Sequence, residues 1–98
     1  MNPAPPGQWL DAAEIERRLR VALAPQSLQV QDDSHHHAGH AGAREGRHYT
    51  VRIGSERFAG LSRVARHRLV YDALGPLASQ GVHALAIVAL APGEAGAG

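Results

Sequence analysis

Three segments with β-strand patterning constrain the fold of this 98-residue chain more than any other feature. Residues 27–33 alternate polar and apolar side chains, and the alternation resumes over residues 48–53. Residues 82–90 form a continuous apolar run of strand length. Between the first two segments, residues 34–46 are rich in Gly, Ala and His, which predicts a long flexible loop. We therefore expect an antiparallel pair with a long connection, followed later by a third strand.

The N-terminal part of the chain is predicted to form a helix. Residues 1–8 are rich in Pro and Gly and are expected to be disordered. Asp11 and Glu14 then have the spacing of a capping box, and the apolar side chains that follow recur at helical spacing. At the other end, residues 92–98 are rich in Gly, Ala and Pro and are expected to form a flexible tail. One small domain over residues 9–91 is the resulting prediction.

The region between the second and third strands has helical patterning, but its apolar residues do not all fall on one side of a single helix. Downstream of Arg66 the apolar side chains share one arc of a helix, whereas Leu61, Val64 and Ala65 do not fit that arc. Extending one helix backwards would place Arg63 and Arg66 on its apolar face. Two short helices with a break near Arg66 remove the conflict, and this is what we predict.

The predicted order is helix, strand, strand, helix, helix, strand. A connection through helices favours a parallel, right-handed crossover between the second and third strands. The end of the first strand and the starts of the other two then lie at the same end of the sheet. The His-rich loop, His48 and His83 are expected to meet there. The fold class is α/β in the broad sense (α+β), with helices packed on a three-stranded mixed sheet.

Histidine is abundant in this chain, whereas cysteine is absent. Five of the seven histidines lie between residues 35 and 48: His35, His36, His37, His40 and His48. Imidazole is a common metal ligand, but without thiolates the chain offers only nitrogen and oxygen donors. A soft iron or copper site would therefore need sulfur from a partner. The lack of cysteine also excludes a disulfide scaffold and a thiol nucleophile.

Composition argues against several other classes of protein. The net charge of +1 is too small to indicate nucleic-acid binding by itself. No leader segment and no apolar run of membrane-spanning length is evident, so we expect a cytoplasmic protein without a membrane partner. No nucleophile–base–carboxylate set, phosphate loop or dinucleotide fingerprint is present, and we predict that the protein is not an enzyme.

Two stretches, residues 58–71 and 82–87, resemble the BolA family. The first contains Arg-His-Arg at 66–68, and the second contains Val-His-Ala-Leu at 82–85, a specific combination. The run Asp-Ser-His-His-His before the second strand and the His-Tyr pair at 48–49 also look like that family. The resemblance covers residues 12–92 and implies an αββααβ fold related to class II KH domains, in agreement with the predicted order.

The resemblance also implies a function. BolA-like proteins bind monothiol glutaredoxins, and the heterodimers can share a [2Fe–2S] cluster to which the glutaredoxin thiolate and glutathione supply sulfur. The BolA-like protein supplies the histidine of the His-Ala-Leu motif, here His83, and a loop residue that matches His37 best, with His48 and His40 as alternatives. Imidazole ligands raise the potential of such a cluster and make its binding pH-sensitive. The isolated chain is expected to hold no cofactor.

Two other functions remain open at this point. One is a DNA-binding transcriptional regulator of stress or morphology genes that uses a KH-like basic helix containing Arg63, Arg66 and Arg68. The chain lacks the Gly-x-x-Gly loop of KH domains, and aromatic stacking residues are scarce, which weakens that hypothesis. The other is a metal-buffering protein that acts through His35, His36 and His37 alone.

Overall fold

The computed structural model describes residues 10–34 and 47–94, and the remaining residues lie outside the description. The elements, in chain order, are α1 (Ala12–Leu23), β1 (Ser27–Asp32), β2 (Arg47–Gly54), the 3-10 turn η4 (Glu56–Phe58), α2 (Arg63–Leu74), the 3-10 turn η5 (Ala78–Gln80) and β3 (Val82–Leu90). The three predicted strands are therefore confirmed. The N-terminal segment expected to be disordered and most of the predicted long loop fall outside the described residues.

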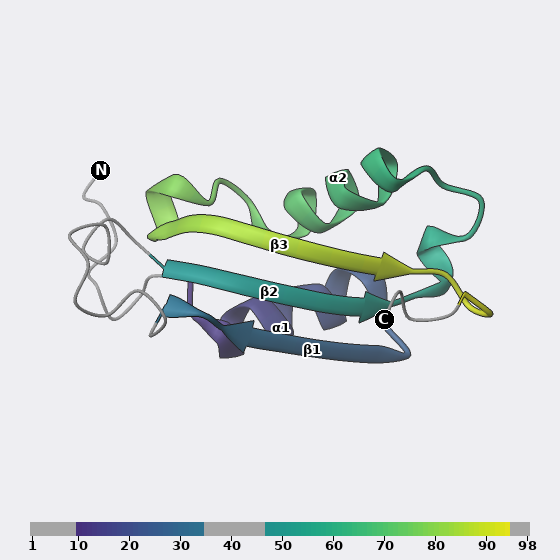
Figure 1. The fold of residues 1–98 in the computed structure, drawn as a ribbon, viewed down its shortest axis with the longest axis horizontal. Coiled ribbons are helices and arrows are strands. Elements are labelled where there is room, and N and C mark those ends of the chain that lie inside the picture. Colours follow the sequence, from purple (N-terminus) through teal and green to yellow (C-terminus); the bar gives the residue numbers. More distant parts are fainter. Residues whose placement is uncertain (1–9, 35–46, 95–98) are drawn as a thin grey trace.

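The sheet has the predicted topology. Its strand order is β1-β2-β3, with β1 antiparallel and β3 parallel to β2. In Figure 1 the sheet lies in front of α1, and α2 runs along the β3 side. The end of β1 and the starts of β2 and β3 meet at one end of the sheet, drawn on the left in Figure 1. We call this the histidine end.

The core lies between the two helices and one face of the sheet. The side chains of Tyr49, Val51 and Ile53 in β2 are buried there, while Thr50 and Arg52 lie on the opposite face. Partly buried apolar residues of β1 and β3 pack against the same core: Leu28, Val30, Leu85, Ile87 and Ala89. The helices contribute Ile15, Leu19, Leu23, Val70 and Leu74. Because both helices use one face, the other face of the sheet is covered by no described element.

Helix α1 begins at the predicted cap, but only half of the capping box forms. The Asp11 Oδ1 atom accepts a hydrogen bond from the Glu14 N–H at 2.9 Å. The Glu14 carboxylate instead accepts from the guanidinium groups of Arg17 and Arg18. These two hydrogen bonds lower the pKa of Glu14 from 4.5 to about 2. The acidic side chain therefore stabilises the helix surface rather than the Asp11 backbone.

The predicted break near Arg66 is wrong, because α2 is continuous over Arg63–Leu74. Its N-terminus is capped by Ser62, whose Oγ atom accepts from the Ala65 N–H at 3.1 Å. Arg66 does lie on an inward side of this helix, with a side chain that is 13% exposed. Its charge is paired with Glu94 at 2.6 Å and 2.8 Å. The helix therefore stays continuous because Glu94 compensates the charge of the inward-facing Arg66.

The ion pair between Arg66 and Glu94 closes one end of the free edge of β3. Leu90 O accepts from the Ser55 N–H, so it faces the β2 side. Carbonyl directions alternate along a strand, and Ala89 O therefore faces away from β2. The Arg66 guanidinium donates to this carbonyl at 3.1 Å while it holds Glu94. The first part of the predicted tail is thereby tied back to the domain, at what we call the arginine end.

Candidate functional site

Two of the predicted metal-ligating histidines lie side by side at the histidine end. His48 is near the start of β2 and His83 is near the start of β3. Their ring centroids are 5.2 Å apart, and the ring planes are inclined by 36°. The parallel crossover therefore brings together two side chains that are 35 positions apart in the sequence, as the predicted topology requires.

A bulge in β3 explains why both rings lie on the same face of the sheet. Arg47 pairs with Val82 and His48 pairs with Ala84, which leaves His83 as an additional residue without a partner position on β2. Strict alternation would send His83 to the face opposite Ala84. Instead Val82 is buried while His83 and Ala84 are both exposed. The bulge therefore turns His83 toward His48.

The backbone of His48 is held by the residues that follow β1. The His48 N–H donates to Ser34 Oγ at 3.1 Å, and the Asp33 N–H donates to the His48 carbonyl at 2.7 Å. The Thr50 hydroxyl donates to the Asp33 carboxylate at 2.5 Å. Asp32 accepts from the Ser34 N–H at 2.8 Å. This network fixes the start of β2, and sequence reasoning missed it, although Asp and Ser at the end of a strand are typical of such local hydrogen bonding.

The other predicted loop ligands, His37 and His40, lie outside the described residues. The loop that contains them leaves Ser34 and returns at Arg47, both at the histidine end. Within residues 10–34 and 47–94, no group of three or more His, Asp or Glu side chains is arranged to hold a metal ion. The two described imidazoles thus form at most part of a coordination sphere, because a four-coordinate metal needs further donors.

A permanently charged arginine lies next to the pair in the sequence but on the other face of the sheet. Arg47 Nη1 donates to the Tyr49 hydroxyl at 3.3 Å, and that hydroxyl donates to the Leu10 carbonyl at 3.4 Å. The hydrogen bond with Tyr49 raises the pKa of Arg47 above its ordinary value. Because Arg47 and Tyr49 alternate with His48 along β2, the guanidinium occupies the helix-covered side. The imidazoles of His48 and His83 lie on the opposite face of the sheet.

The three arginines considered for nucleic-acid binding do not form one basic surface. Arg63 and Arg68 are exposed, but their positions in α2 differ by about 140° around the helix axis. Arg66 lies on an inward side and makes four hydrogen bonds to Leu61, Ala89 and Glu94. Most of its donors are therefore engaged within the domain.

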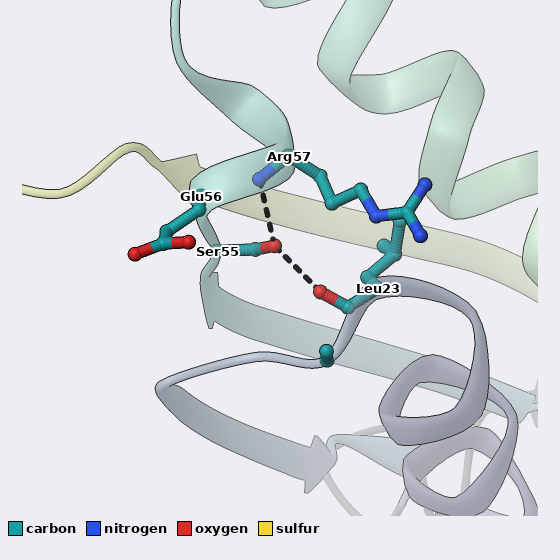
Figure 2. Close-up of a pocket in the computed structure, with 5 residues that line it drawn as sticks. Leu23, Ser55, Glu56 and Arg57 are labelled. Atoms are coloured by element: carbon teal, nitrogen blue, oxygen red, sulfur yellow. Dashed lines mark hydrogen bonds between the residues drawn. The ribbon is translucent and has the colours of Figure 1, made fainter.

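A hollow of about 280 Å³ lies at the opposite end of the sheet from the histidine pair, beside the C-terminal end of α1. Figure 2 shows its lining residues, with Ser55 between Leu23 and Arg57. The buried Ser55 hydroxyl donates to the Leu23 carbonyl at 2.6 Å and accepts from the Arg57 N–H at 3.1 Å. These bonds connect α1 to the end of β2. The hydroxyl donates its proton and accepts a bond within the fold, and this hollow is not our candidate site.

Comparisons with known proteins define the class of the chain. The family model described as BolA-like protein matches residues 19–94. The solved structure of BolA1 from Arabidopsis thaliana superimposes with a TM-score of 0.75 at 40% identity, and the match covers 88% of this chain and 96% of that one. The chain belongs to the BolA family, and its α+β fold is that of BolA domains.

The curated relatives differ in what their names say and in how much of them this chain spans. An uncharacterized protein in the cobS 5' region of Sinorhizobium sp is 48% identical, with 82% of this chain and 89% of the relative covered. The DNA-binding transcriptional regulator BolA of Escherichia coli is 41% identical, with 74% and 68% covered. The chloroplastic protein BOLA1 of Arabidopsis thaliana is 40% identical, with 85% of this chain but only 54% of the relative covered.

These comparisons bear only in part on the predicted cytoplasmic location and on the predicted absence of catalytic activity. No helix among the described residues is both long and apolar enough to cross a membrane. The names of two relatives from Arabidopsis thaliana include a chloroplastic or mitochondrial location. The cytoplasmic location and the absence of catalytic activity therefore stay predictions.

Proposed function

We propose that this BolA-family protein is a non-enzymatic partner of a monothiol glutaredoxin. In the proposed complex the two proteins bind a bridging [2Fe–2S] cluster, and the complex acts in iron–sulfur cluster assembly and trafficking or in iron and redox regulation. The observation that carries this proposal is the approach of the His48 and His83 rings to 5.2 Å, with His83 exposed and His48 half-buried.

The donor set fits the nitrogen-ligated half of such a cluster. Each iron of a [2Fe–2S] cluster needs two ligands besides the bridging sulfides, and two histidines can serve one iron, as in Rieske centres. The glutaredoxin thiolate and the thiolate of glutathione then serve the other iron. Histidine ligation makes the cluster less negative and raises its reduction potential. The pair contributed by this chain supplies half of the ligands, so cluster binding requires the partner.

Three loop or strand histidines compete for the position beside His83. The resemblance to the BolA family favours His37, whereas the geometry favours His48, which is already adjacent to His83. We propose His83 and His48 as the primary pair, with His37 and His40 as alternatives. The backbone bonds that hold His48 support this choice, because a ligand on a fixed element loses less conformational freedom when it binds.

Co-expression with a monothiol glutaredoxin tests the proposal. The complex purified with glutathione should show the visible absorption and circular dichroism of a [2Fe–2S] cluster, with a spectrum different from that of the glutaredoxin homodimer. His83→Ala should abolish that spectrum, and His48→Ala should alter it. His67→Ala in α2 is the matched control and should leave the spectrum unchanged. An unchanged spectrum in His83→Ala contradicts the ligand assignment.

Regulation through DNA binding is the second candidate function. One relative in Escherichia coli is named a DNA-binding transcriptional regulator, and Arg63 and Arg68 are exposed here. This function predicts duplex retardation that falls steeply with salt and weakens in the double variant Arg63→Ala, Arg68→Ala. If the protein does not retard duplex DNA at low salt, the DNA-binding function is excluded. Arg66 is a poor probe, because its replacement would also remove an internal ion pair.

A further inference from the structure

A turn at the arginine end folds the chain back onto α2. It comprises Ala91, Pro92, Gly93 and Glu94, and the Glu94 N–H donates to the Ala91 carbonyl at 3.1 Å. Pro at the second position and Gly at the third, here with a φ of 87°, are typical of a type II turn. This local geometry brings the exposed Glu94 side chain to the Arg66 guanidinium.

The Glu94 carboxylate lies in a site built from three N–H donors. Its Oε1 atom accepts from Arg66 Nη1 at 2.6 Å and from the Ala91 N–H at 2.8 Å, and its Oε2 atom accepts from Arg66 Nη2 at 2.8 Å. We call these donors the oxyanion site, because a guanidinium fork with a backbone N–H matches the paired oxygens of a carboxylate or a phosphate. Arg66, and then the Ala91 N–H, lower the pKa of Glu94 to about 2, so the site stabilises negative oxygen.

The guanidinium of the oxyanion site is held in place by bonds that do not involve Glu94. Arg66 Nε donates to the Leu61 carbonyl at 3.0 Å, and Nη1 donates to the Ala89 carbonyl at 3.1 Å. The fork therefore keeps its orientation when the carboxylate leaves, which lowers the cost of binding another anion. Arg63, one turn earlier in α2, is exposed, and the first turn of this helix contains no acidic residue. The surroundings thus favour negative charge.

We propose that the oxyanion site binds a phosphate group and that Glu94 is a built-in competitor that closes it. Pro92, Gly93 and Glu94 are all exposed, so the carboxylate can leave without a rearrangement of the core. A phosphate offers the same spacing of oxygens, and inorganic phosphate or a phosphomonoester carries close to two negative charges at neutral pH, because its second pKa is about 6. This inference is independent of the histidine pair and of cluster binding.

Titration with inorganic phosphate, followed through the Ala91 amide in ¹⁵N-correlated nuclear magnetic resonance spectra, tests the proposal. In Glu94→Ala this amide should shift and reach saturation. Its affinity for phosphate should exceed that of the wild type by about tenfold or more, because the wild-type carboxylate occupies the site for most of the time. Glu94 is exposed, so the variant should retain the fold, which far-ultraviolet circular dichroism verifies.

A second variant opens the site without removing the carboxylate. Gly93→Val puts a β-branched side chain at a φ of 87°, which strains the turn. The space around a Cβ atom at Gly93 is open, so the strain is confined to the backbone. The affinity of Gly93→Val for phosphate should lie between those of the wild type and Glu94→Ala.

The matched control removes a carboxylate from another arginine. In α1 the Arg20 guanidinium donates to Glu16, and both side chains are exposed. Glu16→Ala makes the same change in net charge as Glu94→Ala, but the arginine that it releases is not fixed by carbonyls as Arg66 is. Glu16→Ala should therefore bind phosphate no more tightly than the wild type.

Two organic phosphates distinguish the possible sources of the group. Methyl phosphate is a monoester and dimethyl phosphate is a diester, and both are titrated into Glu94→Ala. We expect the monoester to bind like inorganic phosphate and the diester to bind more weakly, since it carries a single negative charge. Equal binding of the diester would also support the site and would assign it to phosphodiesters.

Three results would overturn the inference. If the Ala91 amide of the folded Glu94→Ala variant does not respond to phosphate, there is no phosphate site. If the wild type and Glu94→Ala bind phosphate equally well, Glu94 does not close the site. If Glu16→Ala gains as much affinity as Glu94→Ala, the effect comes from net charge and not from the oxyanion site. None of these results bears on cluster binding at the histidine end.

Discussion

The two ends of β3 both carry residues from the segments that resemble the BolA family, but the structure uses them differently. At the arginine end, Arg66 is paired with Glu94 and donates to two backbone carbonyls, so its charge is satisfied within the domain. At the histidine end, the half-buried His48 and the exposed His83 contact each other. The residues that resemble one family thus include Arg66, which maintains the fold, and His83, whose ligand-type side chain is exposed next to His48.

The difference lies in what each side chain faces. The inward position of Arg66 required a partner, and the C-terminal segment supplies it across 28 positions in the sequence. His83 was turned away from the core by the bulge, and the exposed face it reaches contains no described third ligand. Burial with full hydrogen bonding indicates a structural role, whereas exposure of adjacent ligand-type side chains indicates a binding role.

The largest expected effect is the loss of cluster binding, without a loss of stability, when His83 at the histidine end is replaced. His83→Ala should eliminate the cluster from the heterodimer, because the ligand is lost. The same change should alter the free energy of unfolding of the isolated protein by less than about 0.5 kcal/mol, as is usual for an exposed side chain. Urea denaturation of the free variant checks the second part. A large loss of stability would show that His83 also maintains the fold.

At the arginine end the opposite result is expected: replacing Arg66 should lower the stability of the domain and leave the cluster ligands in place. Arg66→Ala should lower the melting temperature by several degrees, since it removes four hydrogen bonds and leaves the Ala89 carbonyl without this donor. Arg63→Ala, an exposed change of the same type in the same helix, is the control and should have little effect. Calorimetric melting curves compare the two. If the Arg66 variant keeps its stability but loses the cluster, the contrast between the two ends is wrong.

A smaller effect is expected from the network behind His48. Thr50→Val keeps the shape of the side chain but removes its hydrogen bond to Asp33, which should cost about 1 kcal/mol of unfolding free energy. The start of β2 should also become more mobile, and hydrogen exchange at the His48 amide should become faster. Gln31→Ala, which removes another donor to Asp33, serves as the comparison. Equal exchange rates in wild type and Thr50→Val would exclude a positioning role for Thr50.

The smallest effect concerns acid stability at the arginine end. Arg66, and then the Ala91 N–H, lower the pKa of Glu94 from 4.5 to about 2. The stabilisation is therefore fully present above about pH 4.5 and is lost as the pH falls through about 2. Glu94→Gln should be less stable than the wild type at neutral pH, and the difference should shrink in this acid range. Melting temperatures measured from pH 6 to 2 provide the check, and a constant difference would contradict it.

The strands and their topology were predictable from the sequence because they depend on local alternation and on a general rule for crossovers. Tyr49, Val51 and Ile53 are buried as expected, and β3 has the expected ends at Val82 and Leu90. The topology alone predicted that His48 and His83 lie at the same end of the sheet. What made these predictions succeed is that each depends on a periodicity or a connection visible in a short stretch of the chain.

The errors and omissions involve contacts between distant residues. A break was predicted at Arg66 because no sequence pattern indicates that Glu94 would pair with it. The bulge at His83 depends on the register of two packed strands, which alternation does not define. The Ser34 and Asp33 bonds to His48 likewise form only once the hairpin has closed. Tertiary packing therefore completes the site, while the sequence indicates where it is located.

The most direct test of the central claim is to detect the nitrogen ligands themselves. This chain, labelled with ¹⁵N-histidine, would be combined with an unlabelled monothiol glutaredoxin and glutathione, and the reduced cluster would be studied by pulsed electron paramagnetic resonance. Two strong ¹⁵N couplings are predicted, of which one disappears in His48→Ala and none in His67→Ala. A cluster in the heterodimer without any histidine coupling would contradict the account.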